Sequence, residues 1–290
     1  MTNPATKTAI GPMTVVAIEQ HEAPRRRIIT DPLAHSMLPL GVKAIVRACA
    51  VPMVRRAMVN GLDGQAPGMW ASFLCRKRYM DDLVAEALTD GLPQVVILGA
   101  GFDTRAWRLD VPASASVFEV DLPENIARKR ATLRRLLDRE QDNVHLVECD
   151  FETQPLAETL AGHGYRDQDP TVFVWEAVTQ YLTEPAIRGT FEFLATAAPP
   201  SRLAFTYIRR DFLDGDNVYG GAAMRRRFVD RQRLWKFGWH PDDVAPFLRE
   251  YGWAETEQLG PEQYVARYVA PSGRDLPVSE IERMARADRH

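Results

Sequence analysis

The chain has 290 residues, of which 46% are hydrophobic and 26% charged, and its formal net charge at pH 7 is -3. This length allows one large domain or a core with an appended subdomain. The charge argues against a general nucleic-acid binder, and the lack of any stretch of about 18 uninterrupted apolar residues excludes a membrane span. Neither a nucleic acid nor a membrane is therefore an expected partner.

The segment from Met1 to Ile10 lacks the apolar core of a signal peptide, which predicts a cytoplasmic protein. Cys49, Cys75 and Cys149 are too scattered and odd in number for a disulfide framework or a zinc motif, so we expect them to be small buried residues. The six histidines show no metal-ligand spacing, and the chain has no obvious Ser-His-Asp set. The sequence predicts no metal site.

The first ninety residues predict helices and no strands, which we interpret as a helical cap or lid over residues 1–90. Asp31 and Pro32 are an acidic cap and a first-position proline, and they begin a short predicted helix. Val42 to Asn60 is mostly apolar but contains Pro52, which predicts two helices broken near that proline. These helices form either an amphipathic lid or a part of the core.

The clearest helical pattern of this region runs from Met69 to Leu88, with apolar residues at spacings of three, four and seven. Arg76 lies three residues after Phe73 and four before Met80, so it falls on the buried face. A buried cation requires an anionic partner. That partner is either a core carboxylate or, in the interpretation we prefer, the carboxylate of a ligand.

The apolar run from Val95 to Leu98 breaks into two glycines one residue apart, which predicts a buried strand followed by a ligand-binding turn. Gly99 and Gly101 let the backbone turn tightly and approach a nucleotide. Thr104 stands in place of the third glycine of the dinucleotide fingerprint, which weakens the case for a cofactor with a pyrophosphate. A nucleoside cofactor without phosphates fits better, and S-adenosylmethionine is the commonest of these. The alternative is an ordinary strand-to-helix turn.

Strand and helix patterns alternate through the rest of the chain. Strands are predicted at Ser116 to Val120, Val144 to Glu148, Thr171 to Glu176 and Leu203 to Ile208, with a closing hairpin-like pair at Trp253 to Gln258 and Tyr264 to Val269. Helices are predicted from Leu122 to Leu137, Glu184 to Ala197 and Pro241 to Tyr251. This alternation predicts an α/β fold with a doubly wound, mostly parallel sheet over residues 91–290. An insert after the fifth strand, at about 209–240, is expected to face the substrate.

Open parallel sheets bind ligands at the carboxyl ends of their strands, and several acids lie at these ends. The strand-end candidates are Gly99, Gly101, Asp103, Glu119, Asp121, Asp150, Phe151, Glu176, Gln180 and Tyr181. Asp121 follows Gly101 by 20 residues, a spacing typical of a carboxylate that accepts hydrogen bonds from ribose hydroxyls. Asp150 can accept from an adenine amino group, and Phe151 can cover the ring. Each acid alone could equally be a helix cap or a solvated turn residue.

These residues resemble those of the leucine carboxyl methyltransferase family, which includes polyketide carboxyl methyltransferases. The resemblance spans most of the chain, and its most specific part is Leu-Gly-Ala-Gly-Phe-Asp-Thr-Arg at 98–105 followed by Glu-Val-Asp-Leu-Pro at 119–123. Further matches are Asp31 to Ala34, Arg76 to Asp82, Arg108-Leu109, Asp150-Phe151 and Trp175 to Leu182. The resemblance implies the seven-stranded, Rossmann-like sheet of class I methyltransferases and S-adenosylmethionine as the cofactor.

The resemblance also implies roles for single residues. It places Arg76 on the methionine carboxylate, Glu176 near the methionyl amino group and Asp121 on the ribose. The whole candidate cofactor-binding set is Arg76, Gly99, Ala100, Gly101, Asp103, Arg105, Asp121, Leu122, Asp150, Phe151 and Glu176. Ala177 and Gln180 depart from the family, in which many members carry glycine and an apolar residue, so the substrate can differ.

Together these features predict an S-adenosylmethionine-dependent O-methyltransferase of secondary metabolism, a monomer or homodimer, that esterifies a carboxylate of a small molecule or peptide terminus. A carboxylate acceptor, with a pKa near roughly 4, is ionised at neutral pH and needs no general base. The candidate catalytic residues are Gln180, Tyr181, Tyr207 and Arg209, and Tyr219, Trp235 and Trp239 line either an aromatic pocket or the interior.

Two other functions stay open. The first is a phenol or alcohol O-methyltransferase, which would require a base, although His21, His35 and His240 are not convincingly placed for that role. The second is a non-catalytic cofactor-binding partner protein. The strand-end acids argue against the second alternative.

Overall fold

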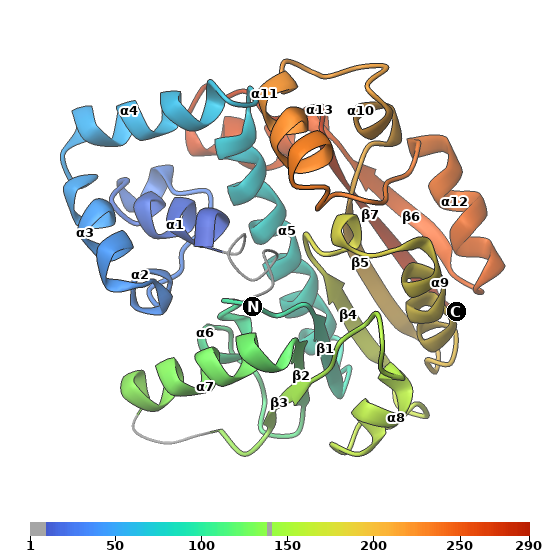
Figure 1. Ribbon diagram of the computed structural model, residues 1–290. Helices are drawn as coiled ribbons and strands as arrows, with labels where there is room; N and C mark the ends of the chain where they lie inside the picture. The colour runs from blue at the N-terminus through green and yellow to red at the C-terminus, as the bar shows by residue number, and fades with distance from the viewer. Residues whose placement is uncertain (1–9, 138–140) are drawn as a thin grey trace.

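The computed structural model describes residues 10–137 and 141–290, and Figure 1 shows its arrangement. A seven-stranded sheet crosses the molecule in the order β3-β2-β1-β4-β5-β7-β6. The strands are β1 (Gln94–Leu98), β2 (Ser116–Asp121), β3 (Val144–Glu148), β4 (Thr171–Trp175), β5 (Ser201–Ile208), β6 (Ala254–Leu259) and β7 (Glu282–Arg289). Strands β1 to β5 are parallel, whereas β7 is antiparallel to both β5 and β6. The predicted doubly wound, mostly parallel, seven-stranded sheet is confirmed.

Helices cover both faces of the sheet because its central strands are apolar on both sides. Val95 and Ile97 belong to one hydrophobic cluster, which includes residues of α1, α5 and α7, while Val96 and Leu98 belong to the other, which includes residues of α8, α9 and α12. The α-helices are α1 (Ile10–Glu19), α2 (Ala34–Met37), α3 (Leu40–Ala48), α4 (Pro52–Asp63), α5 (Met69–Thr89), α6 (Arg105–Arg108), α7 (Pro123–Leu136), α8 (Leu156–Ala161), α9 (Glu184–Leu194), α10 (Arg210–Asp214), α11 (Ala222–Arg225), α12 (Pro241–Glu250) and α13 (Pro261–Tyr264). We call the hydrophobic cluster that contains Val95 and Ile97 the first-face cluster, and the one that contains Val96 and Leu98 the second-face cluster.

The N-terminal helices share the first-face cluster with the sheet. Val16 of α1 and Ala71 of α5 pack in the same cluster as Val95, so the hydrophobic core crosses the predicted boundary at residue 90. The division into a cap and a catalytic domain stays a prediction. The predicted absence of a signal peptide concerns Met1 to Ile10, of which residues 1–9 lie outside the described part of the chain. No helix in the described ranges is long and apolar enough to cross a membrane.

The apolar segment before α5 forms two helices, as its proline predicts. Helix α3 ends at Ala48 and α4 begins at Pro52. Helix α4 has no fully buried residue, and it contributes to the core only through Val59 and Leu62, which are partly buried against the first-face cluster. Its other large apolar side chains, Met53, Val54 and Met58, are exposed because α4 runs along the outer edge of the helical layer (Figure 1). The lid interpretation stays a prediction.

The closing pair of strands was predicted with one wrong member. The segment from Tyr264 to Val269 is helical, because Pro261 occupies the first turn and the side chain of Gln263 accepts a hydrogen bond from the N–H of Gly260 at 2.9 Å. The true partner of β6 is β7, whose sequence Glu-Arg-Met-Ala-Arg-Ala-Asp-Arg is mostly charged. Because β7 lacks an apolar run, its sequence does not predict a strand, although it is hydrogen-bonded to a neighbouring strand on each edge.

The insert after β5 occupies residues 209–239 and returns to the sheet end beside its own beginning. It contains α10, α11 and a π-helical turn at Arg226–Arg231. Phe212 and Trp235 of this insert pack in one cluster with Met69, at the start of α5. The insert therefore covers the N-terminal end of α5, and its contact with a substrate stays a prediction.

A buried ion pair joins β2 to α7. Nζ of Lys129 lies 2.7 Å from a carboxylate oxygen of Glu119, and the two side chains are 1% and 0% exposed. Burial raises the pKa of Glu119 to about 7, with Lys129 opposing this rise. Because the folded pKa lies above the ordinary value of 4.5, Glu119 costs the protein stability as the pH rises from about 4.5 to above 7.

We expect Lys129→Met to lower the free energy of unfolding by about 3 to 5 kcal/mol at pH 8, because it leaves a buried carboxylate without its cation. The loss should be smaller at pH 5, where Glu119 binds a proton. Urea unfolding followed by circular dichroism at both pH values measures it. The double variant Glu119→Gln/Lys129→Met serves as the control and should recover most of the loss. An equal loss at both pH values, without recovery in the double variant, contradicts this account.

Candidate functional site

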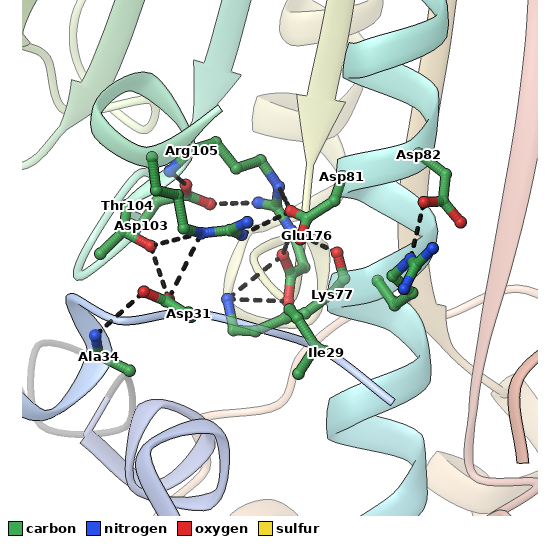
Figure 2. A network of polar contacts seen from close by, with 12 residues as sticks. Ile29, Asp31, Ala34, Lys77, Asp81, Asp82, Asp103, Thr104, Arg105 and Glu176 are labelled. Atoms are coloured by element: carbon green, nitrogen blue, oxygen red, sulfur yellow. Dashed lines mark hydrogen bonds and ion pairs between the residues drawn. The ribbon is translucent and has the colours of Figure 1, made fainter. Parts of the chain in front are cut away.

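A buried network of charged side chains lies between α5, the turn after β1 and the end of β4 (Figure 2). Arg105 is at its centre and is only 1% exposed. Its guanidinium donates to Asp81 of α5 at 2.8 Å, to Glu176 after β4 at 2.9 Å, and to Asp103 of its own turn. The side chains of Arg105 and Asp103 thus form hydrogen bonds within the protein that fix the turn. A direct contact of either residue with a cofactor stays a prediction.

Three cationic side chains contact the carboxylate of Glu176. Nε of Arg76 donates to it at 3.0 Å, Nζ of Lys77 lies 3.2 Å from Oε1, and Arg105 donates to Oε2. Burial alone would raise the pKa of Glu176, but Lys77, Arg105 and Arg76 together hold that pKa well below its usual range. Glu176 is therefore ionised at neutral pH.

Arg76 is buried, as its place on the helix predicts, and is 4% exposed. Its guanidinium pairs with Glu176 and with Glu282 of β7, and it lies over the ring of Phe73, 4.8 Å from the centroid. Both partners in this structure are core carboxylates, which is the alternative that the sequence also allowed. Glu282 is 206 residues away, so no local pattern could have identified it. The contact of Arg76 with a ligand carboxylate stays a prediction.

The glycine turn after β1 is closed by the end of β2. The N–H groups of Gly99 and Ala100 both donate to the carbonyl of Val120, at 2.8 and 2.9 Å. The N–H of Gly101 donates to the carboxylate of Asp121 at 2.5 Å. The predicted turn and the predicted acid are therefore in direct contact, although 20 residues separate them.

Two positions in this region have the left-handed backbone that favours glycine. Gly99 has a φ of +74°, and a Cβ on it would lie 2.2 Å from Cγ2 of Val178. Ala177 has a φ of +57°, and its N–H donates to the hydroxyl of Thr206 at 2.7 Å. The backbone at 177 thus explains why glycine suits this position in the family that the sequence resembles.

Asp121 is held at the beginning of α7. Its Oδ1 accepts from the N–H of Leu122 and from the side-chain amide of Asn125, each at 2.7 Å. Burial raises the pKa of Asp121, and these donors oppose the rise. Asn125 had no role in the sequence prediction. Asn125 lies in the first turn of α7, and its position four residues after Asp121 is the signal that could have found it.

Asp150 and Phe151 lie at the same edge of the sheet as Asp121. Strand β3 pairs with β2, and the N–H of Cys149 donates to the carbonyl of Asp121 at 2.9 Å. Asp150 is half-buried and accepts from the N–H of Glu152 at 3.0 Å, while Phe151 packs at the margin of the second-face cluster. The fold thus brings these two predicted residues close to Asp121.

The four predicted catalytic residues lie in different surroundings. Gln180 and Tyr181 occupy the 3-10 turn at Thr179–Tyr181, shortly after Glu176. The buried Oε1 of Gln180 has no hydrogen-bond partner among the described residues. The carbonyl of Gln180 accepts from the N–H of Lys236 at 2.7 Å, which attaches the insert to this turn.

Tyr207 and Arg209 are not brought into the charged network. Tyr207 is fully buried in the second-face cluster, and its hydroxyl donates to Gln258 at 2.7 Å. Arg209 pairs with Asp211 and with Glu280. The structure therefore gives both side chains local structural partners, and a catalytic role for them stays a prediction without geometric support.

The aromatic residues that the sequence predicted to line either a pocket or the interior belong to two clusters, and Trp235 and Trp239 are buried in them. Trp239 packs edge-on against Tyr207, with the ring centroids 5.9 Å apart. Trp235 stacks on Phe228 in a separate cluster that Tyr219 borders. A pocket formed by all of them stays a prediction.

Asp31, which the sequence predicted only as a helix cap, is also a part of the network. Its Oδ1 accepts from the N–H groups of Leu33 and Ala34, each at 3.0 Å, in the turn that leads into α2. The helix itself begins at Ala34, so Pro32 lies in this turn and is not the first helical residue that the sequence predicted. Its Oδ2 accepts from the hydroxyl of Thr104 at 2.6 Å and lies 3.5 Å from Nε of Arg108. Asp31 thereby attaches the segment before α2 to the glycine turn.

Residues 9–195 match the family model described as leucine carboxyl methyltransferase. The chain belongs to this family. A protein of Mycolicibacterium paratuberculosis, with the assigned name S-adenosyl-L-methionine-dependent methyltransferase, is 30% identical over 255 residues, which are 83% of this chain and 80% of that protein. A protein of Mycolicibacterium smegmatis with the same assigned name is 32% identical over 287 residues, which are 96% of this chain and 90% of that protein. The family and these relatives bear out S-adenosylmethionine as the cofactor and methyl transfer as the reaction class.

Solved structures agree on the fold. A family 574 protein of unknown function from Streptomyces avermitilis has a TM-score of 0.57 at 14% identity, with 96% of this chain and 97% of that chain covered. A protein of Thermobifida fusca described as a methyltransferase has a TM-score of 0.56 at 17% identity, with coverages of 81% and 88%. At such identities the likeness concerns the class I methyltransferase fold alone.

We expect Gly99→Ala to destabilise the protein more than Gly91→Ala. Both glycines have a positive φ, +74° and +83°, but a Cβ at Gly91 meets nothing within 4 Å. Gly91→Ala should therefore cost about 1 to 2 kcal/mol for the left-handed backbone alone. Gly99→Ala should cost about 1 to 3 kcal/mol more, because of the overlap with Val178.

Urea unfolding of both variants measures this difference. The double variant Gly99→Ala/Val178→Ala removes the overlap, and after correction for Val178→Ala alone it should be close to Gly91→Ala. Equal losses in the two single variants would show that the contact between residue 99 and Val178 is not restrictive.

Proposed function

We propose that the protein transfers a methyl group from S-adenosylmethionine to a carboxylate of a small molecule or a peptide terminus. The observation that carries this proposal is the buried pair of Arg76 and Glu176, whose Nε and Oε1 are 3.0 Å apart, at the end of β4 and next to the glycine turn of β1. The amino-acid end of the cofactor has one carboxylate and one ammonium group. A buried cation and a buried anion side by side are complementary to that end.

The residues at the strand ends fit the chemical groups of the cofactor. Arg76 and Lys77 would bind its carboxylate, and Glu176 would bind its ammonium group. A zwitterion that enters between these side chains replaces one ion pair by two, so the buried charges stay compensated. Asp121 would accept from the ribose hydroxyls, and Asp150 would accept from the adenine amino group. When bound, the cofactor supplies an electrophilic methyl group on a positively charged sulfur.

A carboxylate acceptor suits this site because it needs no base, and the side chains that could act as one are hydrogen-bonded, partly buried or exposed to solvent. Burial raises the pKa of Tyr207 above its usual range, and its hydroxyl is already hydrogen-bonded. The ring of His21 contacts a backbone carbonyl at 2.9 Å, burial lowers the pKa of His35, and His240 is exposed at the start of α12. A carboxylate, with a pKa near about 4, attacks without losing a proton. The protein then acts by positioning the acceptor and excluding water.

One observation favours a second candidate function, the methylation of a phenol or alcohol. Oε1 of Gln180 is buried and has no hydrogen-bond partner in the described part of the chain. It could accept a hydrogen bond from the hydroxyl group of a phenol or alcohol substrate. A carboxylate substrate is ionised at neutral pH and has no proton to donate. Gln180 does not ionise, however, so it would orient a hydroxyl and could not remove its proton.

The cysteines support a cytoplasmic location as part of this proposal. Cys49, Cys75 and Cys149 are all free and buried. Unpaired thiols are usual in reducing compartments, whereas extracellular proteins more often contain disulfides. A role in secondary metabolism and the monomeric or homodimeric state stay predictions.

We expect Asp121→Asn to weaken binding of S-adenosylmethionine by about tenfold to a hundredfold, since the amide loses a charged acceptor for the ribose. Isothermal titration calorimetry with the cofactor and with S-adenosylhomocysteine measures the dissociation constants. Asp110→Asn is the matched control, because Asp110 is an exposed acid in the loop before β2. Circular dichroism checks the fold of both variants. Equal affinities of Asp121→Asn and the wild type would refute the assignment of the ribose site.

Incubation with methyl-labelled cofactor and the small-molecule fraction of a cell extract should yield a label that mild base removes. An ester is cleaved by mild base, whereas an aryl or alkyl ether is not. A base-stable label would favour the phenol or alcohol alternative. The absence of turnover, despite cofactor binding, would favour a non-catalytic protein.

A further inference from the structure

Helices α3 and α4 bury very little of their own surface. Val46 is the buried residue of α3, and α4 has none. Both helices lie at the outer edge of the molecule, where α3 packs on α1 and α4 packs on α5 (Figure 1). A helix with so little burial normally presents polar side chains to water.

These helices instead present apolar side chains. In the described part of the chain, eight large hydrophobic residues are exposed, and six of them lie between residues 40 and 58. These six, which we call the outer apolar surface, are Leu40, Ile45, Val51, Met53, Val54 and Met58. Leu40 is 85% exposed and Met53 is 81% exposed, so these two side chains are almost entirely in water. Apolar patches of this kind mark interaction sites in soluble proteins.

The spacing of these residues makes the outward face of each helix continuous. In α4, Met53 and Ala57 are four residues apart, as are Val54 and Met58, so all four share one face. In α3, Leu40 is followed at intervals of four by Ala44 and Ala48, which are also exposed. The inward side of α4 is formed by other residues, such as Val59 and Leu62, which pack against the first-face cluster.

The charge around the outer apolar surface has one sign. From Pro32 to Leu62 the sequence contains no Asp or Glu but has Lys43, Arg47, Arg55 and Arg56, although the whole chain has a net charge of -3. Arg47 and Arg56 are exposed, while Arg55 is bound to Glu22 and to the carbonyl of Cys49. The outer apolar surface is therefore bordered by cations that face solvent.

We propose that the outer apolar surface binds an anionic lipid bilayer, with α3 and α4 lying in the headgroup layer. Exposed apolar side chains enter the boundary of the acyl chains, and cations at their border contact acidic headgroups, which is how interfacial amphipathic helices bind. A second copy of this chain fits the surface less well. A two-fold contact would bring the cations of both copies together without an acid of this segment to compensate them. The lack of a membrane-spanning helix does not bear on binding of this kind, and the proposal does not depend on the methyl acceptor.

Flotation with lipid vesicles tests the proposal on the full chain. The wild type should float with vesicles of phosphatidylglycerol and phosphatidylcholine, and much less with pure phosphatidylcholine. Binding should weaken as salt is raised, because screening shortens the reach of the cations. Free inorganic phosphate at the same concentration as the lipid should not compete, since it offers no apolar phase.

Two double variants separate the apolar from the electrostatic contribution. Leu40→Ser/Met53→Ser and Arg47→Gln/Arg56→Gln should each reduce partitioning to the anionic vesicles by about tenfold or more. The matched control is Leu136→Ser/Arg226→Gln, which changes an exposed leucine and an exposed arginine on other elements and should bind like the wild type. Because the replaced side chains are exposed, circular dichroism should show an unchanged fold. The single variants Leu40→Ser and Met53→Ser replace the double variant if it unfolds.

Several results would overturn the proposal. They are failure of the wild type to float with either vesicle, equal binding of the outer variants and the control, and equal binding to neutral and anionic vesicles. Sedimentation velocity without lipid provides the remaining test. A concentration-dependent dimer that Leu40→Ser/Met53→Ser abolishes, combined with no vesicle binding, would assign the surface to a second copy of the chain instead.

Discussion

The buried guanidinium of Arg105 is the group on which the rest of the site depends. It contacts Asp81 on α5, Asp103 in the turn after β1 and Glu176 after β4, and it is almost completely excluded from water. A buried charge is tolerated only when its partners are in place, so these three segments must come together in one arrangement. The glycine turn, the long helix α5 and the end of β4 thereby acquire fixed positions relative to one another.

This constraint also sets the electrostatics of the site. Glu176 stays ionised because Lys77, Arg105 and Arg76 surround it. Arg76 in turn is shared between Glu176 and Glu282, which connects the network to β7. A site built in this way has charges of both signs fixed before any ligand binds, which is what the zwitterionic end of the cofactor requires in our proposal. Methyl transfer to an ionised acceptor requires little more than such positioning.

The outer helices follow the opposite principle. At the strand ends, polar groups are buried and paired, whereas along α3 and α4 apolar groups are exposed and cations point to solvent. The two regions are nevertheless connected through a short segment. Asp31 accepts hydrogen bonds from the N–H of Ala34 at the start of α2 and from the hydroxyl of Thr104 beside the glycine turn. The segment that leads into the outer helices is thus anchored at the candidate cofactor site (Figure 2).

The sequence by itself determined the parts that depend on local patterns. Unbroken apolar runs predicted β1 and β4, the glycine pair predicted the turn, and helical spacing identified Arg76 as buried. The family motif added the cofactor. The sequence misassigned the last strand, because β7 is mostly charged and is fixed by pairing on both edges.

Only the tertiary structure decided which charges meet. The second partner of Arg76 comes from 206 residues away, and Asp81 and Arg105 form a pair over 24 residues. It also decided that Tyr207 packs inside, since the alternation of β5 places it among the rings of the second-face cluster. The physical reason is that pairing of buried charges and the facing of a strand depend on the assembled layers, which local sequence does not specify.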